Sequence, residues 1–92
     1  MTRLIERVQI INKLGLHARA AAKFVGVAQR HDCKVQIGCS EQALVDGKSI
    51  MQVMMLAANK GTEVCLICEG SEAQAAMTEL IELINNQFGE GE

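Results

Sequence analysis

The sequence contains no proline, tryptophan or tyrosine, and only two phenylalanines, Phe24 and Phe88, among its 92 residues. So few aromatic side chains exclude a base-stacking platform for single-stranded nucleic acid. A net charge of −2, with both signs interspersed, also excludes a basic nucleic-acid-binding face. We therefore expect no nucleic-acid partner and a core built from aliphatic side chains and methionine.

Long apolar runs are also missing. No stretch approaches the ~20 apolar residues that a membrane helix needs. The chain begins MTRLIERVQI, which is charged early and lacks the apolar centre of a signal peptide. We therefore expect a cytoplasmic protein with no membrane insertion. Without linkers or repeats, the length predicts one domain over residues 1–92.

Four cysteines are the compositional feature that suggests redox or metal chemistry. Cys65 and Cys68 have CxxC spacing, and Cys33 and Cys39 lie upstream. The segment TEVCLICEG, however, has the pattern of a strand, in which residues three apart point to opposite faces. Two such thiols cannot jointly hold a metal or pair easily. We interpret these cysteines as small, buried or half-buried hydrophobic residues, and expect no metal and no cofactor.

The hydrophobic pattern predicts seven elements in the order β-α-β-β-α-β-α. We expect strands at 3–11, 33–38, 42–46 and 62–69, and helices at 18–30, 50–58 and 73–88. Strands 33–38 and 42–46 are expected to form a hairpin, and Gly61 is expected to end the second helix. This order suggests one sheet with the helices packed on one face.

Three apolar stripes predict the core. The first helix places Ala21, Phe24, Val25 and Ala28 on one face. The last helix carries the stripe Ala73, Ala76, Met77, Leu80, Ile81, Ile84 and Phe88. The short helix contributes Val53, Leu56 and Ala57.

His17 occupies the position just before the first predicted helix, where Ser, Thr, Asp or Asn is usual. Backbone N–H groups at a helix start lack partners and, with the helix dipole, form an anion site. A capping oxygen would fill that site, whereas we expect His17 to leave the donors free. The same positive field disfavours imidazolium, so we expect a neutral, nucleophilic ring at about pH 7.

Arg19, two residues further on, adds a fixed positive charge to this helix start. A neutral imidazole beside free N–H donors and a guanidinium suits a phosphoryl group, which a ring nitrogen could accept by nucleophilic attack. An alternative interpretation is that His17 merely ends a loop and Arg19 is a solvated surface residue. His31, at the end of the same helix, is assigned no chemistry.

The segment SIMQVMMLAA predicts a helix with only Gln52 polar inside it. Because a small two-layer domain buries one side of such a helix, Ile50, Met51 and Met54 are expected to stay partly exposed. Clustered exposed apolar side chains mark a docking surface, although a more deeply buried helix is the alternative. Ser49 is the expected N-cap, and its phosphorylation would add about −1.5 to −2 charges beside this surface.

Two motifs together resemble a known family. GLHARAAAKFV is similar to the active-site signature of the HPr family, the histidine-containing phosphocarriers of the bacterial phosphoenolpyruvate-dependent phosphotransferase system. GKSIMQVMMLAANKGTEV resembles the serine region of that family, and the resemblance covers nearly the whole chain. It implies an α+β, two-layer open-faced β-sandwich, with a four-stranded antiparallel sheet and three helices on one face. It also implies a stoichiometric phosphocarrier rather than a turnover enzyme.

The resemblance implies that His17 accepts a phosphoryl group on Nδ1 from enzyme I, which phosphoenolpyruvate phosphorylates, and passes it to a histidine of an enzyme IIA. Arg19 is then the arginine that steadies the phosphoryl group, whose oxygens the N–H groups of Ala18, Arg19 and Ala20 could hold. Ser49 matches the serine that an HPr kinase/phosphorylase modifies in some bacteria. The expected partner surface comprises Ala18, Ala22, Lys23, Lys48, Ile50, Met51 and Met54.

The chain departs from the family pattern at Ala20, where proline is usual. Alanine fits a first helical turn and restores one N–H donor, so we expect carrier activity to survive. We expect a monomer with moderate partner affinity, and a rim of Arg19, Lys23 and Lys48 that steers acidic partners to the apolar surface.

Several function classes stay open at this point. Sugar-transport and nitrogen-related regulatory carriers share the histidine motif, and the intact GKS motif leans toward the serine-controlled type. An interaction module in which His17 is incidental, and a thiol or metal protein, are the other two hypotheses. Phosphate uptake that depends on His17 would separate the carrier from both.

Overall fold

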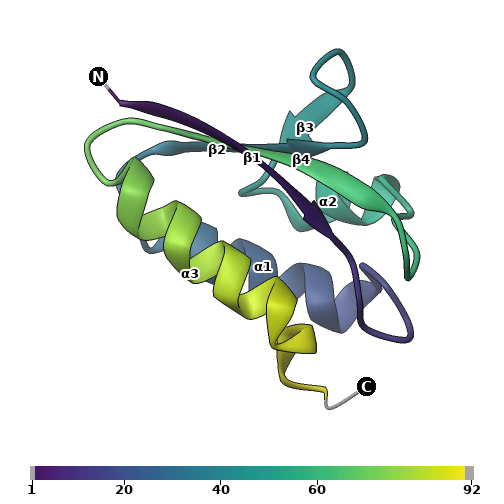
Figure 1. The fold of residues 1–92 in the computed structure, drawn as a ribbon. Coiled ribbons are helices and arrows are strands. Elements are labelled where there is room, and N and C mark those ends of the chain that lie inside the picture. The colour runs from purple at the N-terminus through teal and green to yellow at the C-terminus, as the bar shows by residue number, and fades with distance from the viewer. Residues whose placement is uncertain (1, 91–92) are drawn as a thin grey trace.

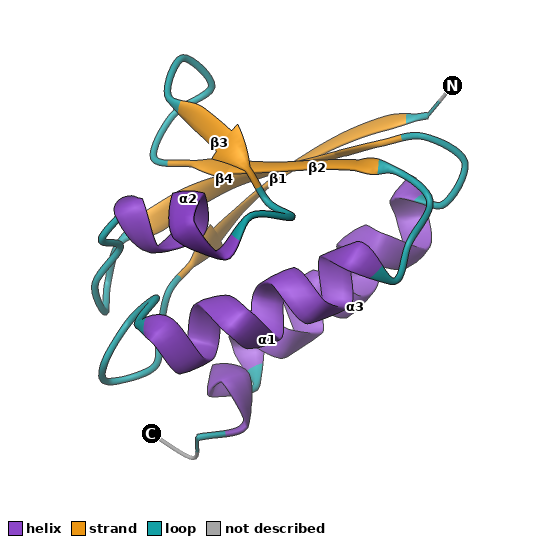
Figure 2. Cartoon of the chain, turned by 180° about the vertical axis from the view of Figure 1, so that it is seen from behind, coloured by secondary structure: helices purple, strands orange, loops and turns teal. Residues whose placement is uncertain are grey.

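The computed structural model describes residues 2–90, which form a four-stranded antiparallel sheet with helices packed on one face (Figure 1). The strands are β1 (Arg3–Gln9), β2 (Lys34–Gly38), β3 (Leu44–Asp46) and β4 (Glu63–Glu69). The helices are α1 (Ala18–Gln29), α2 (Ile50–Met55), α3 (Ala73–Asn85) and a short 3₁₀ helix, η1 (Gln87–Gly89). Figure 2 shows α1, α2 and α3 on the same side of the sheet. The predicted fold class is confirmed.

Strand β4 lies in the middle of the sheet, whose order is β1-β4-β2-β3. It pairs antiparallel with both β1 and β2, and the predicted hairpin of β2 and β3 is confirmed. Val64, Leu66 and Cys68 belong to the core under the helices, while Cys65 and Ile67 are buried outside that cluster. This central position explains the uninterrupted apolar run VCLIC, which differs from the alternating pattern of a half-exposed strand.

The helical stripes that the sequence predicts supply most of the core. In α1 the predicted residues Ala21, Phe24, Val25 and Ala28 are all buried, together with Ala20. In α3 the predicted stripe is buried except for Ile81, which is partly buried against the core. Full burial of each large aliphatic or aromatic side chain stabilises the fold by about 1.5–3 kcal/mol. These stripes therefore hold α1 and α3 on the sheet.

Helix α2 is shorter than the sequence predicts. It ends at Met55, and Ala57, predicted to face the core, is exposed with a left-handed φ of 50°. The reason is Ala58, which is buried and accepts a hydrogen bond at 2.9 Å from the Leu16 N–H. If the helix continued to Ala58, the carbonyl of Ala58 would not reach the Leu16 N–H. The chain therefore turns at Ala57 instead. Gly61 does not end the helix but lies in the turn before β4.

The other two core predictions for the α2 segment, Val53 and Leu56, are confirmed. Val53 is fully buried, and Leu56 is partly buried against the core. Ile50, Met51 and Met54 are exposed, as predicted. Met55, which was not predicted to belong to this surface, is exposed as well. The alternative of a deeply buried helix is therefore wrong.

The last helix also ends before the predicted boundary. Helix α3 stops at Asn85, and Gln87 and Phe88 adopt positive φ in η1. Phe88 is fully buried, as predicted, but it reaches the core through this turn rather than from the helix. The Lys23 ammonium of α1 donates a 2.6 Å hydrogen bond to the Phe88 carbonyl. This contact holds the C-terminal turn against α1.

None of the helices formed by residues 2–90 has the length and apolar character that crossing a bilayer requires.

The loop before α1 is fixed by close backbone contacts. The Gly15 N–H donates to the Asn12 carbonyl at 3.2 Å, and the Leu16 N–H donates to the Ala58 carbonyl. Gly15 has a φ of 66°, and a Cβ built on it would lie 2.4 Å from the Ala58 oxygen. Only glycine allows both this conformation and this approach. The loop therefore delivers His17 to the N-terminus of α1 in one defined position.

We expect Gly15→Ala to lower the free energy of unfolding by at least about 2 kcal/mol, because it adds a left-handed alanine and a backbone clash. Gly26→Ala is the matched control, since it lies within α1 and its added Cβ meets nothing within 4 Å. That variant should gain about 0.5–1 kcal/mol. Urea unfolding measures both, and equal effects of the two substitutions would contradict the role given to Gly15.

Candidate functional site

His17 is the N-cap of α1, and hydrogen bonds fix both ring nitrogens. Nδ1 accepts a bond from the Arg19 N–H at 3.3 Å, and Nε2 lies 2.5 Å from a carboxylate oxygen of Glu90. An amide N–H needs a lone pair on Nδ1, and a carboxylate needs a proton on Nε2. These contacts therefore select the tautomer in which Nδ1 carries the nucleophilic lone pair. The ring is 24% exposed, so a partner can reach it.

This geometry corrects one expectation. His17 was predicted to leave all the first N–H groups of the helix free, but its Nδ1 accepts from the Arg19 amide. The imidazole thus takes the place of the usual capping oxygen. An electrophile that bonds to Nδ1 would displace this contact and release the Arg19 N–H at the same moment.

Glu90 is held in place by Asn12. The Asn12 amide donates from Nδ2 to Glu90 Oε1 at 3.0 Å and to the Gly15 carbonyl at 2.8 Å. Asn12 is fully buried, so this amide has little freedom to move. The Asn12 bond, followed by His17 and the charge of Arg19, holds the Glu90 pKa below the usual value of a glutamate, although burial opposes the shift.

Glu90 and Asn12 were not predicted as site residues. Asn12 carried a weak signal, since an amide in a short loop beside a candidate nucleophile has a hydrogen-bonding capacity that needs a partner. Glu90 carried none, because its contact with His17 spans 73 positions of the chain.

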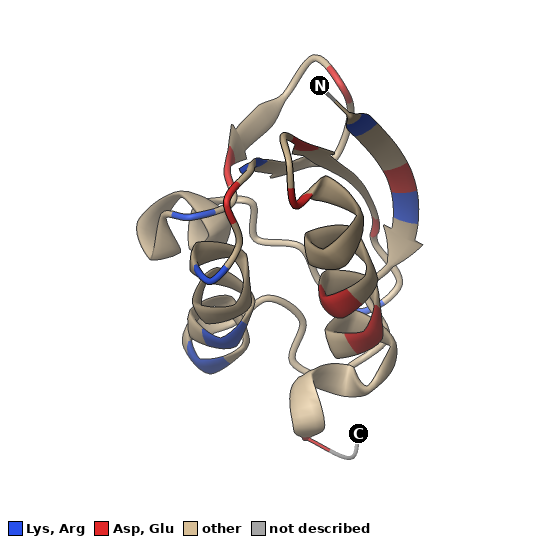
Figure 3. Ribbon diagram, turned by 90° about the vertical axis from the view of Figure 1, so that its left-hand side faces the viewer, with Lys and Arg blue, Asp and Glu red and all other residues tan. Residues whose placement is uncertain are grey.

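A basic hollow lies next to the ring. It is lined by Lys13, Leu14, Arg19, Lys23, Gly89 and Glu90. Figure 3 shows basic residues on α1 and acidic residues on α3, so the positive charge gathers on the helix that carries His17. Lys48 does not belong to this group, because its ammonium donates to the His31 carbonyl beyond the C-terminal end of α1. Of the three predicted rim residues, Arg19 and Lys23 therefore line this hollow, and Lys48 does not.

The predicted apolar surface is exposed. Met51 is 72% exposed, and Ile50, Met54, Met55 and Leu14 are exposed as well. The views agree that α2 lies over the N-terminal half of α1, where His17 begins the helix (Figure 2). Ala18 and Ala22 are exposed on α1. The structure thus brings an apolar surface and the candidate nucleophile to the same side of the molecule.

Ser49 is the N-cap of α2, as predicted. Its Oγ accepts a bond from the Gln52 N–H at 3.3 Å, and the residue is half-buried. Ala20 is the third residue of α1, a position in the first turn that proline would also tolerate.

His31 has a different environment from that of His17. Its ring contacts Glu72 at 3.2 Å and Glu79 at 2.9 Å, and only 10% of its side chain is exposed. These contacts join the C-terminal end of α1 to α3 and leave no ring nitrogen open to a partner. His31 is therefore a useful control for His17.

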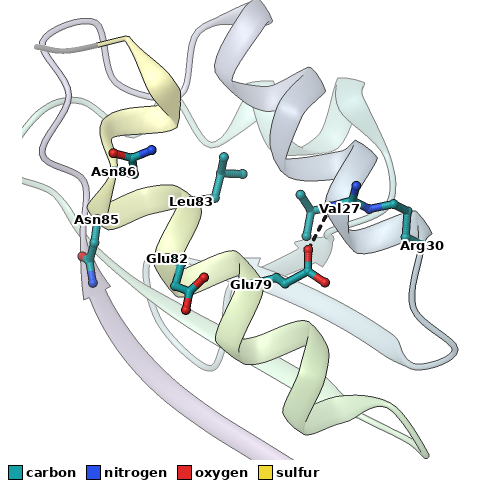
Figure 4. A pocket seen from close by; sticks show the side chains of 7 residues that line it. All are labelled: Val27, Arg30, Glu79, Glu82, Leu83, Asn85 and Asn86. Atoms are coloured by element: carbon teal, nitrogen blue, oxygen red, sulfur yellow. Dashed lines mark hydrogen bonds and ion pairs between the residues drawn. The ribbon is translucent and has the colours of Figure 1, made fainter.

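A groove between α1 and α3 is separate from the candidate site (Figure 4). Val27 and Leu83 are partly buried against the core there, and Arg30 pairs with Glu79 at 2.9 Å across the groove. None of the predicted site residues lines it.

The four cysteines lie mostly in the interior of the protein. All four are free. Cys65 and Cys68 are fully buried and Cys33 is half-buried, as predicted, but Cys39 is exposed, so the predicted burial is wrong for this residue. Burial raises the pKa of the Cys68 thiol to about 12 and also raises that of Cys33, so neither is an activated thiolate. Within residues 2–90 there is no group of three or more His, Cys, Asp or Glu side chains that could hold a metal ion.

Comparisons with known proteins identify the family of the chain. Residues 5–86 match the family model described as "PTS HPr component phosphorylation site". The phosphocarrier protein HPr of Pseudomonas aeruginosa is 62% identical over 85 residues, which cover 92% of this chain and 94% of that protein. HPr of Pseudomonas putida is 65% identical with the same coverage. A crystal structure of HPr from Thermoanaerobacter tengcongensis gives a TM-score of 0.87 at 37% identity and covers 98% of each chain.

The contact of Asn12 with Glu90 predicts a pH dependence. Because the Glu90 pKa is lowered on folding, its carboxylate stabilises the fold above the unfolded-state pKa. That contribution is lost as the pH falls through the lower folded-state pKa. Asn12→Ala removes the largest cause and should raise the Glu90 pKa, measured by carbon NMR of the side-chain carboxyl. Gln9→Ala, which removes an amide bound to Gly61 on the exposed end of β1, should leave it unchanged. An unchanged Glu90 titration in Asn12→Ala would contradict this assignment.

Proposed function

The chain belongs to the HPr family of phosphocarrier proteins of the phosphotransferase system, and we propose that it carries the phosphoryl group on Nδ1 of His17. It is a phosphocarrier protein rather than a catalytic enzyme. The observation that carries the assignment of the atom is the pair of ring contacts: Nδ1 faces the α1 N-terminus, and Nε2 faces a carboxylate. With its proton on Nε2, the ring offers only Nδ1 to phosphorus.

The helix start supplies the groups that would hold the phosphoryl oxygens. When Nδ1 bonds to phosphorus, the Arg19 N–H loses its acceptor and can donate to a phosphoryl oxygen instead. The amides of Ala18 and Ala20 belong to the same helical turn, whose dipole favours an anion. The Arg19 guanidinium adds a fixed charge on the exposed side. Alanine at position 20 is compatible with this arrangement.

We propose enzyme I as the donor and a histidine of an enzyme IIA as the acceptor, in sugar uptake or in regulation. Support comes from the exposed apolar surface of Ile50, Met51 and Met54 on α2, which packs against α1, and from the basic residues Arg19 and Lys23, which line the hollow on α1. A small apolar surface with a basic rim suits acidic partners that must leave quickly after each transfer. We propose a cytoplasmic monomer for this role.

Ser49 is proposed as a regulatory phosphorylation site. Its hydroxyl caps α2, and the next residues of the chain, Ile50 and Met51, belong to the apolar surface. A phosphoryl group there would add about −1.5 to −2 charges at the edge of the proposed interface. That charge would suit the N-terminus of α2 but would oppose an acidic partner. An HPr kinase/phosphorylase is the proposed modifying enzyme.

Incubation with phosphoenolpyruvate and enzyme I should attach one acid-labile phosphoryl group per chain. His17→Ala should abolish the uptake, while His31→Ala should keep it, because the His31 ring is occupied by two glutamates. Intact mass and phosphorus NMR measure the product. A wild-type chain that takes up no phosphate would favour the interaction module instead, and a phosphorylated His17→Ala protein would show that another residue is the acceptor.

A carboxylate placed in the proposed interface should weaken binding to enzyme I. We expect both Ser49→Asp and Met51→Asp to raise the KM for enzyme I roughly 10-fold or more, as expected for like charges facing each other at an interface. Ser49→Ala should keep the KM and lose only about 1 kcal/mol of stability with the cap. Ser71→Asp, at an exposed position before α3, adds the same charge away from this surface. An equal rise in the KM for Ser71→Asp would refute this docking surface.

A further inference from the structure

We propose that Glu90 is a positioning residue for phosphoryl transfer: its carboxylate holds the proton on Nε2 of His17 and so presents the Nδ1 lone pair to the phosphoryl donor. This inference rests on the proposed function of His17. It assigns a role to the C-terminal end of the chain, beyond the helix start and Arg19.

The contact between Glu90 and His17 is supported by further hydrogen bonds. Glu90 Oε2 lies 2.5 Å from Nε2, while Oε1 of the same carboxylate accepts from the Asn12 amide at 3.0 Å. Asn12 is itself fixed by the Gly15 carbonyl at 2.8 Å and is fully buried. The carboxylate is 14% exposed, so water competes little for its oxygens. A surface ion pair between two freely moving side chains would have none of this support.

The backbone leading to Glu90 is held as well. The Glu90 N–H donates to the Gln87 carbonyl at 3.0 Å, and the Gly89 N–H donates to the Asn86 carbonyl at 2.9 Å. Lys23 anchors the same turn through the Phe88 carbonyl. The carboxylate is therefore positioned by the end of the chain and by the loop before α1 together.

The chemistry explains why a carboxylate at this point would matter. The Nδ1 lone pair forms a bond to phosphorus while the bond between phosphorus and the donor atom of phospho-enzyme I breaks and leaves its electron pair on the donor. The ring keeps its proton on Nε2 and becomes a phosphoimidazolium, which carries a positive charge. Glu90 faces that N–H, so its attraction to the ring strengthens as the charge develops. When the phosphoryl group leaves for an acceptor, the ring returns to its neutral form.

The other charged groups around the ring cannot replace Glu90. Lys13, Arg19 and Lys23 line the hollow beside it, and all three are cations that disfavour a positively charged ring. Glu90 is the one carboxylate among the residues that line this hollow. It therefore offsets a basic surface that is useful for holding phosphate but unfavourable for the phosphoimidazolium.

The first test needs no partner protein. In the unphosphorylated chain, nitrogen-15 NMR should find the ring proton of His17 on Nε2, with slow exchange into water. Glu90→Gln should speed that exchange, whereas Glu41→Gln, which removes the same charge from an exposed loop, should not. A proton found on Nδ1 in the wild-type chain, or unchanged exchange in Glu90→Gln, would overturn the proposal.

The second test is kinetic. With enzyme I and phosphoenolpyruvate, Glu90→Gln should lower the limiting rate of phosphoryl uptake about 10-fold without changing the KM, since one charge-assisted hydrogen bond that strengthens in the transition state is lost. Glu90→Asp, which keeps the charge but shortens the reach, should fall between Glu90→Gln and the wild type. Glu41→Gln should match the wild type.

These outcomes separate the two proposals. A wild-type chain that takes up no phosphate defeats the carrier function, while the NMR result still decides whether Glu90 fixes the ring. A Glu90→Gln chain that transfers at the wild-type rate defeats the positioning role and leaves the carrier function intact. A rate loss that parallels a fall in thermal stability, with unchanged proton exchange, would assign Glu90 a structural role only and overturn the proposal.

Discussion

The site depends on one close backbone contact. It joins the loop before α1 to Ala58, the residue that follows the turn at the end of α2. The Leu16 N–H bonds to the Ala58 carbonyl, and Gly15 passes so close to that carbonyl that no side chain fits between them. This contact fixes where α1 begins and forces α2 to end early, with Ala57 in a left-handed conformation. It thereby joins the helix that begins at His17, the candidate nucleophile, to the helix that carries the apolar surface. The bond between Leu16 and Ala58 therefore sets the position of His17 relative to the apolar surface.

Different residues form the proposed phosphorylation site and the proposed docking surface. The ring of His17 is held by polar contacts on both nitrogens: an amide at 3.3 Å on Nδ1, and a short, partly buried contact with a carboxylate on Nε2. The apolar surface is wide open, and its methionine side chains can adapt to partners of different shape. A rigidly held ring beside an adaptable surface suits a phosphocarrier protein, which takes up a phosphoryl group and passes it on. Affinity can then stay moderate while the reacting atoms are still well aligned.

The sequence predicts the periodic parts of the fold well, for a physical reason. A helix that packs on a sheet must repeat apolar residues at its own period, so the faces of α1 and α3 can be read directly from their stripes. A strand buried on both sides must be continuously apolar, as β4 is. His17 was predictable as a cap because the helix start has a local signature.

Features that depend on distant contacts could not be predicted in this way. The end of α2 is set by the partner of Ala58, and no pattern in the α2 segment encodes it. The position of the Lys48 ammonium depends on the carbonyl of His31, 17 positions earlier in the chain. Glu90 reaches His17 only because the turn at Phe88 redirects the chain after α3. Each of these features depends on contacts between distant parts of the chain, whereas a sequence pattern predicts only local structure.

The place of the C-terminal turn has a practical consequence for handling this protein. The described chain ends beside the α1 N-terminus, whereas β1 begins at the opposite end of the molecule (Figure 1). An affinity tag, fluorophore or surface linker joined after residue 92 would follow Glu90, which contacts the His17 ring, by only two residues. The same addition before β1 would project away from the helix start. Fusions and immobilised forms of the protein are therefore better built from the amino end.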